Sequence, residues 1–119
     1  MCGITGFLYR SKRPSKAELS QNVLRMANRL RHRGPDAGGS WADANTGVAL
    51  GHRRLSIIDL SAAGAQPMNS ASGRHVIAYN GEIYNFSATR QRLEAEGYPF
   101  AGHSDTEVLL AAIEHWGLQ

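Results

Sequence analysis

Hydrophobic residues recur along the chain at two spacings, which predict short strands and amphipathic helices. Residues 3–9 are rich in β-branched and aromatic side chains and are expected to form a strand. In residues 15–30, apolar side chains lie three or four positions apart, which predicts a helix with one buried face. Its first turn has the Ser-x-x-Glu sequence of a capping box. The expected core-facing positions of this helix are Leu19, Val23, Met26, Ala27 and Leu30.

The middle of the chain is expected to be extended and interrupted by turns. A Gly-Pro pair follows the first helix, and residues 31–39 are predicted to form a loop. A hairpin is predicted around residues 45–47, and residues 53–60 are expected to continue it as an extended segment. The small and polar residues 61–73 are typical of a surface loop.

A second hairpin is predicted in the last third of the chain. Residues 75–79 have the composition of a strand. The Asn80-Gly81 pair that follows is a strong signal for a tight turn, after which residues 82–84 are expected to resume as a strand.

The predicted elements end with two helices. The first covers residues 87–96 and closes at Gly97, and the second opens with a capping box at Ser104. Its expected buried stripe comprises Val108, Leu109, Ala112, Ile113 and Trp116. Because little sequence remains to cover this stripe, we expect a domain that is truncated at its C-terminus.

Composition limits the class of protein. A chain of 119 residues with a hydrophobic fraction of 42% can form one domain with its own core. The single cysteine excludes an internal disulfide and a thiolate zinc site, and it favours a cytoplasmic location. No apolar run approaches the ~18 residues of a membrane span, so no membrane partner is expected.

Charge and histidine content indicate neither a nucleic-acid partner nor a metal. The net charge is +3, and basic residues are concentrated in the first third of the chain. No aromatic residues interleave with them, which favours a solvated surface over a nucleic-acid-binding patch. The five histidines lack metal-ligand spacing, so no metal site is expected.

The only cysteine, Cys2, directly follows the initiator methionine. Because cysteine is small, an aminopeptidase normally removes a methionine before it, which would leave Cys2 with a free α-amine. Such an amine can act as the base for the side-chain nucleophile of the same residue. Gly3 and Gly6 beside it indicate a close approach to the backbone, either by a substrate or by simple packing.

Cys2 belongs to the first of five separated motifs, which occupy residues 2–4, 31–36, 54–57, 80–85 and 103–105. In this order they resemble the glutaminase domain of the class II glutamine amidotransferases, which are N-terminal nucleophile hydrolases. The resemblance covers essentially the whole chain. The Arg-His-Arg-Gly-Pro-Asp form of the second motif makes the glutamine-dependent asparagine synthetases the closest match.

The resemblance implies an α+β fold, namely the four-layer αββα sandwich in which two antiparallel sheets pack between helices. It implies hydrolysis of glutamine to glutamate and ammonia, with the ammonia used for asparagine synthesis from aspartate in a full-length parent. No cofactor is expected in residues 1–119, because ATP and Mg belong to the synthetase domain of such a parent. The expected partners are glutamine, that synthetase domain and a second copy of the chain.

The resemblance also implies catalytic roles, which agree with the chemistry of the residues. Cys2 is expected to be the nucleophile. The Asn80 side-chain amide and the Gly81 backbone N–H are expected to form the oxyanion hole. The alternative for this pair is a plain hairpin turn.

The remaining implied residues bind the head group of glutamine. Arg54 suits the α-carboxylate, since its guanidinium can bind a carboxylate through two hydrogen bonds. Glu82 and Asp105 suit the α-ammonium, although Asp105 alone would be read as a helix cap. Arg53 is expected to be a surface residue. Other positions that border the substrate are Leu55, Ile57, Ile58, Asn80 and Gly81.

A rival reading is a non-catalytic, glutaminase-like scaffold or binding module. The presence of Cys2, Arg54, Asn80 and Asp105 argues against it. An amidotransferase domain that serves an acceptor other than aspartate is a further alternative.

Overall fold

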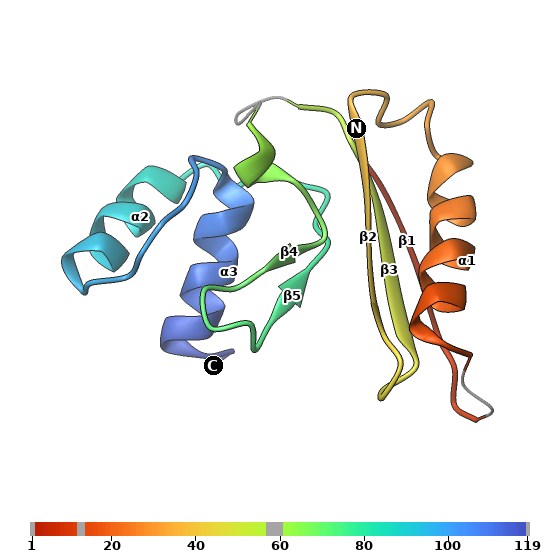
Figure 1. Cartoon of the computed structure of the whole chain (residues 1–119). Coiled ribbons are helices and arrows are strands. Elements are labelled where there is room, and N and C mark those ends of the chain that lie inside the picture. The colour runs from red at the N-terminus through yellow and green to blue at the C-terminus, as the bar shows by residue number, and fades with distance from the viewer. Residues whose placement is uncertain (1, 12–13, 57–60, 119) are drawn as a thin grey trace. The chain divides into compact units, whose positions relative to one another are not determined.

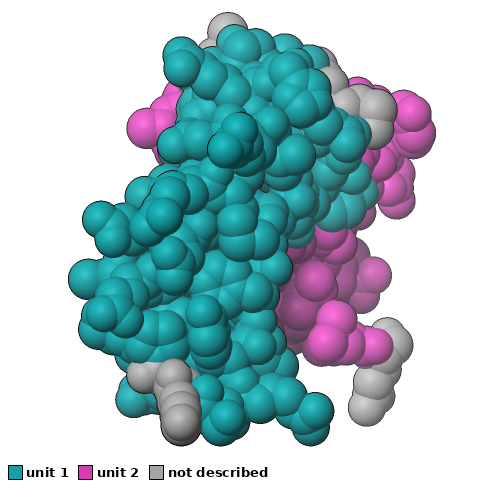
Figure 2. Space-filling model, turned by 90° about the vertical axis from the view of Figure 1, so that its right-hand side faces the viewer, with its two compact units in different colours: residues 1–56, 65–67, 78–80 teal, residues 57–64, 68–77, 81–119 magenta. Residues whose placement is uncertain are grey.

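A computed structural model describes residues 2–11, 14–56 and 61–118, which fold as α+β with antiparallel sheets (Figure 1). The chain divides into two compact units, shown in different colours in Figure 2. Unit 1 comprises residues 1–56, 65–67 and 78–80, and unit 2 comprises 57–64, 68–77 and 81–119. Within the described ranges, no helix is both long and apolar enough to cross a lipid bilayer.

The elements of unit 1 are β1 (Gly3–Leu8), α1 (Lys16–Asn28), β2 (Ala37–Asp43) and β3 (Val48–Arg54). Strand β3 lies between β1 and β2 in an antiparallel sheet, and α1 covers one face of that sheet (Figure 1). The core of the unit consists of the buried residues Leu19, Val23, Ala42 and Ala49.

Helix α1 begins as predicted but buries a narrower face. The Ser15 hydroxyl accepts a hydrogen bond from the Glu18 N–H at 3.3 Å, which confirms the N-cap. The structure confirms three of the expected buried positions, namely Leu19, Val23 and Ala27. Met26 is 39% exposed, so the expectation that it faces the core is wrong. Leu30 is half-buried and lies against Gly3 of β1. The small three-stranded sheet covers only one stripe of the helix.

Close packing explains the glycines of β1. A Cβ atom on Gly3 would lie 2.9 Å from the Cβ of Leu30, and one on Gly6 would lie 2.8 Å from the carbonyl oxygen of Ala49. The sequence left open whether a substrate or simple packing approaches this strand, and these contacts with Leu30 and Ala49 favour packing.

The hairpin between β2 and β3 turns where the sequence predicts. The Asp43 carboxylate accepts hydrogen bonds from the Asn45 N–H at 3.0 Å and from the Thr46 hydroxyl at 2.9 Å. Gly47 completes the turn with a φ of 75°. Strand β2 begins at Ala37, inside the predicted loop 31–39, because it pairs with β3 from that residue on.

The elements of unit 2 are η1 (Ala62–Gly64), β4 (Met68–Asn69), β5 (Val76–Ile77), α2 (Phe86–Ala95) and α3 (Asp105–Trp116). Helices α2 and α3 pack around Leu93, Val108 and Ala111, which are all buried. Gly97 ends the turn after α2 with a φ of 88°, and the Ser104 hydroxyl accepts the Glu107 N–H at 3.1 Å. Both predicted helices are confirmed.

The predicted hairpin at Asn80-Gly81 is wrong. Strand β5 pairs with β4, with Met68 opposite Ile77, so the surface loop expected over residues 61–73 contains η1 and a strand. Residues 82–84 form no strand, because the Ile83 N–H is hydrogen-bonded to the Asp105 carboxylate instead of to a neighbouring strand.

The predicted stripe of α3 is only partly correct. Val108 is buried as expected, but Leu109, Ala112 and Ile113 are half-buried and Trp116 is 39% exposed. Leu110 and Ala111 are buried in their place. The helix contacts other parts of unit 2 on more than one side, and the periodicity of its sequence alone does not reveal which sides are buried.

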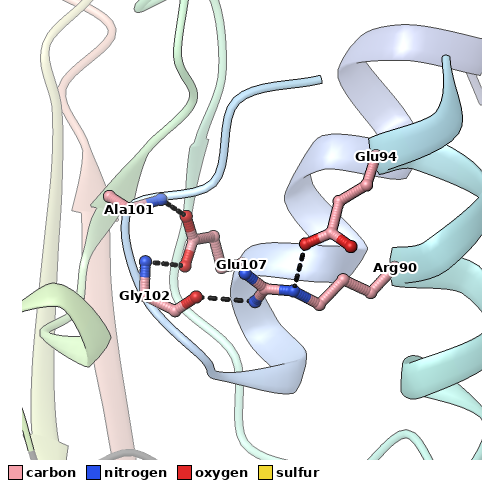
Figure 3. A network of polar contacts seen from close by, with 5 residues as sticks. All are labelled: Arg90, Glu94, Ala101, Gly102 and Glu107. Atoms are coloured by element: carbon pink, nitrogen blue, oxygen red, sulfur yellow. Dashed lines mark hydrogen bonds and ion pairs between the residues drawn. The ribbon is translucent and has the colours of Figure 1, made fainter. Parts of the chain in front are cut away.

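Acidic side chains hold the parts of unit 2 together. Figure 3 shows the Glu107 carboxylate accepting the N–H groups of Ala101 at 2.6 Å and Gly102 at 2.8 Å. Arg90 donates to Glu94 at 2.8 Å and to the Gly102 carbonyl at 2.6 Å (Figure 3). The loop before α3 is therefore fixed by residues of both helices.

A second acidic residue, Glu114 of α3, binds the hairpin of β4 and β5. It accepts hydrogen bonds from the hydroxyls of Ser70 at 2.6 Å, of Ser72, and of Tyr98 at 2.7 Å. The bonds from Ser70, Ser72 and Tyr98 lower the pKa of Glu114 to about 2. Burial, and then the hydrogen bond to Glu114, raise the pKa of Tyr98 to about 12.

Candidate functional site

Cys2 lies at the end of β3, where the sheet register brings it. Gly3 is paired with Arg53, so the residue before Gly3 lies beside the residues that follow Arg53. The Leu55 N–H donates to the Cys2 Sγ at 3.3 Å, and the thiol in turn lies 3.6 Å from the Leu55 carbonyl oxygen. The half-buried thiol is thus held by the backbone of a single residue.

The Gly-Pro-Asp part of the second motif lies along the same stretch of chain. The Asp36 N–H donates to the Arg54 carbonyl at 3.0 Å, and the Asp36 carboxylate accepts the Ser56 N–H at 2.8 Å. Arg53 donates from Nε to the Gly34 carbonyl at 2.8 Å. The expectation that Arg53 is a surface residue is wrong, since it is half-buried and holds this loop.

Two of the predicted substrate-binding residues therefore lie in the segment that contacts the thiol. Arg54 is the last residue of β3 and is half-buried, and Leu55 follows it directly. The hydrogen bonds from Asp36 fix the backbone on both sides of Leu55. Ile57 and Ile58, also predicted to border the substrate, lie outside the described residues.

Asn80 is exposed and ends unit 1, directly after a residue whose backbone is firmly held. The Tyr79 carbonyl oxygen lies 3.3 Å from Nε2 of His52, and the Tyr79 N–H donates to Oε1 of Gln66 at 2.6 Å. His52 itself is only 1% exposed.

In unit 2, Asp105 is buried at the start of α3. Its Oδ2 accepts the Ile83 N–H at 2.9 Å, and its Oδ1 accepts the Thr106 N–H at 2.9 Å. The exposed Glu82 directly precedes Ile83, so the two predicted acidic residues are brought near each other. Gly81 is exposed and belongs to this unit as well.

The structure thus places the predicted site residues in two separately described sets. Unit 1 holds Cys2, Arg54, Leu55 and Asn80, and unit 2 holds Gly81, Glu82 and Asp105. No group of three His, Cys, Asp or Glu side chains that could hold a metal ion occurs in the described part of the chain.

Sequence reasoning gave no role to the contacts of Asp36, His52 and Gln66. Asp36 belongs to a motif that the sequence singled out, so its importance could have been inferred. His52 is one polar residue in a strand, and Gln66 lies in what reads as a surface loop. Neither has a local signal, because each contacts Tyr79 across a long stretch of chain.

Comparison with known proteins places the chain among relatives that are much longer. The chain is 41% identical over 116 residues to glutamine-hydrolyzing asparagine synthetase 1 of Bacillus subtilis, covering 98% of this chain and 18% of that protein. It is 41% identical over 117 residues to glutamine-hydrolyzing asparagine synthetase B of Escherichia coli, covering 98% of this chain and 20% of that protein. Amidase chry2 of Gibberella zeae is 38% identical over 125 residues, covering 99% of this chain and 18% of that protein.

The chain therefore spans about a fifth of the length of these relatives. Over its whole length, residues 1–119, it matches the profile of the family described as "Glutamine amidotransferase domain". These similarities show that the chain belongs to the class II glutamine amidotransferase domain family.

Proposed function

We propose that this domain hydrolyses glutamine to glutamate and ammonia through a thioester on Cys2. The position of Cys2 gives the strongest support, because its Sγ is held by the Leu55 backbone at the end of β3, next to Arg54. The nucleophile thus contacts the backbone next to Arg54, whose guanidinium suits the α-carboxylate of an amino acid. The family match supports glutamine as that amino acid.

In the proposed reaction, the α-amine of Cys2 accepts the thiol proton, and Sγ attacks the carbonyl carbon (Cδ) of the glutamine side-chain amide. Asn80 and the Gly81 N–H donate hydrogen bonds to the negatively charged oxygen of the tetrahedral intermediate. Collapse breaks the C–N bond and releases ammonia, which takes up the proton from the α-ammonium of Cys2. Water then cleaves the γ-glutamyl thioester, which gives glutamate and restores the thiol.

The head group of the substrate has two charges that require opposite partners. We assign the α-carboxylate to Arg54 and the α-ammonium to Asp105 and Glu82. The Oδ2 atom of Asp105 accepts the Ile83 N–H, which orients the carboxylate. The backbone of three further residues is proposed to border the head group: Leu55, Ile57 and Ile58.

The similarity to asparagine synthetases, and the fraction of their length that the chain spans, support a role within a larger protein. We propose a four-layer αββα fold for the complete glutaminase domain, with a synthetase domain that uses ATP and Mg to activate aspartate. Because one relative is named as an amidase, a second candidate function is transfer of the ammonia to an acceptor other than aspartate. Asparagine formation from aspartate, ATP and glutamine by the full-length protein distinguishes the two.

The test of the glutaminase proposal combines intact mass with activity in a full-length protein. Cys2→Ala should abolish glutamine hydrolysis and leave synthesis from free ammonia unchanged, because that chemistry does not use the thiol. A protein that retains Met1 has an amide in place of the basic amine, so its hydrolysis should fall by about a hundredfold to ten-thousandfold. Full turnover from protein that retains Met1, or labelling of another residue by a reactive glutamine analogue, would contradict the assignment.

A further inference from the structure

Two polar side chains bind the backbone N–H and carbonyl groups of Tyr79, the residue directly before Asn80. His52 Nε2 lies 3.3 Å from the Tyr79 carbonyl oxygen, and Gln66 Oε1 accepts the Tyr79 N–H at 2.6 Å. All four residues belong to unit 1. The Tyr79 carbonyl shares its planar peptide group with the N–H of Asn80, so the contact with His52 fixes the plane in which the chain enters Asn80.

The protonation state of His52 is determined by its surroundings. The Nδ1 atom is buried and has no hydrogen-bond partner among the described residues, whereas Nε2 faces a carbonyl that can only accept. The neutral ring with its proton on Nε2 satisfies this arrangement, and a second proton on Nδ1 would lack an acceptor. Burial, and secondarily the charge of Arg54, lower the pKa of His52, although the Tyr79 carbonyl opposes them.

The sheet holds His52 and lies against the backbone of Gln66. His52 lies in the central strand β3, directly opposite Gly39 of β2. The carbonyl oxygen of Gln66 lies too close to Gly39 for a Cβ atom to fit there, so the absence of a side chain admits the Gln66 backbone. Both residues that bind Tyr79 are therefore located at the paired positions 39 and 52 of the sheet, His52 as a member of β3 and Gln66 through its backbone against Gly39.

We propose that His52 and Gln66 are positioning residues that orient Asn80 as an oxyanion-hole donor. This inference rests on the proposed glutaminase function, in which Asn80 stabilises the tetrahedral intermediate. An exposed side chain can serve as a preorganised donor only if its backbone is fixed, and these two contacts fix it. Because the donor acts on charge that develops in the transition state, the contacts should affect kcat more than the binding of ground-state ligands.

The experiment uses the full-length protein and the variants His52→Leu and Gln66→Met, which remove the donor and the acceptor for Tyr79. We expect kcat for glutamine hydrolysis to fall about tenfold to a hundredfold in each, somewhat less than the loss of a whole oxyanion donor. The inhibition constant of the product glutamate should change by less than about threefold, since product binding does not need the oxyanion contact. A purely structural role would change both quantities together.

His75→Leu is the matched control. His75 also has a buried Nδ1 without a hydrogen-bond partner among the described residues, but it lies in unit 2, whereas Tyr79 and Asn80 belong to unit 1. Its kcat should stay within about twofold of wild type. The double variant of His52 and Gln66 should lose less activity than the product of the two single losses, because both contacts act on one residue.

A second pair tests the geometry if His52→Leu does not fold. His52→Gln places an N–H donor near the position of Nε2, whereas His52→Asn places one near Nδ1. We expect the kcat of the Gln variant to be about tenfold higher than that of the Asn variant. Equal kcat in this pair, or unchanged kcat in Gln66→Met, overturns the positioning role. Wild-type protein without Cys2-dependent hydrolysis would instead overturn the proposed function.

Discussion

The two units use their polar side chains differently. In unit 1, side chains bind the backbone of the segments that carry the candidate site: Asp36 binds the chain around Leu55, and Gln66 binds Tyr79. In unit 2, Glu107 and Glu114 bind loops and hairpins of their own unit. The comparison indicates that these long-range polar contacts of unit 1 serve site geometry, whereas those of unit 2 chiefly serve the fold.

Asp105 is the exception in unit 2. It is buried, and it binds the segment that leads from Gly81 and Glu82 to Ile83. Because Asp105 also accepts the Thr106 N–H of its own helix, its substitution should affect both activity and stability. Substitutions in the two units can therefore test whether the comparison holds.

Asp105→Ala should have the largest effect of these substitutions. It removes the proposed partner of the α-ammonium and leaves the Ile83 N–H without its acceptor, which should cost about 1–3 kcal/mol of stability. We also expect KM for glutamine to rise about a hundredfold. Paired denaturation and kinetic measurements check this, and a change in stability without a change in KM would place Asp105 with the other acidic residues of unit 2.

Arg54→Lys should reduce glutamine binding with little change in stability. The charge remains, but the two-pronged geometry for a carboxylate is lost, so KM should rise by about tenfold or somewhat more. The melting temperature should stay close to that of wild type. Lys16→Arg is a control on the exposed face of α1 and should change neither quantity. An unchanged KM in Arg54→Lys would remove Arg54 from the site.

Glu114 should give unit 2 a pH-dependent stability. Its pKa is about 2 in the folded state and near 4.5 in an unfolded chain, so the unfolded state binds more protons between these values. The stabilisation is complete above pH 4.5 and is lost as the pH falls toward 2. In Glu114→Gln the melting temperature should depend less on pH in this window, and thermal melts from pH 7 to 3 measure the difference. Glutamine KM should not change.

Arg90 and Arg92 form a matched pair with the smallest expected effects. The Arg90 side chain is 19% exposed, binds the Gly102 carbonyl and lies 4.4 Å from the ring centre of Phe100. Arg92 is 70% exposed and lies 4.5 Å from the ring centre of Trp116. We expect Arg90→Ala to cost about 1–2 kcal/mol and Arg92→Ala less than about 1 kcal/mol. Equal losses in chemical denaturation would contradict this ranking.

The sequence predicted best those features that depend on neighbouring residues. The N-caps at Ser15 and Ser104 and the turn at Gly47 each need only a few consecutive residues, and each was found where predicted. That Cys2 and Leu55 belong to one site was expected only through the family resemblance. Its physical cause is the register between β1 and β3, which joins residues far apart in the chain.

The wrong predictions have a common cause, because partners far away in the sequence compete with the local pairing that the sequence suggests. Asn80-Gly81 has the composition of a hairpin turn, yet β5 pairs with β4, and Ile83 binds Asp105. No property of the local sequence could decide between these partners. The roles of His52 and Gln66 likewise depend on contacts across 27 and 13 positions of the chain.

The contact between Gly39 and Gln66 also constrains how the sequence of this domain can change over evolution. A side chain at position 39 would displace the carbonyl of residue 66, and with it the amide that binds Tyr79. Because every residue type has a backbone carbonyl, this contact requires glycine at position 39 whatever side chain stands at position 66. Among homologous sequences, position 39 is therefore expected to remain glycine even where the residue at position 66 differs.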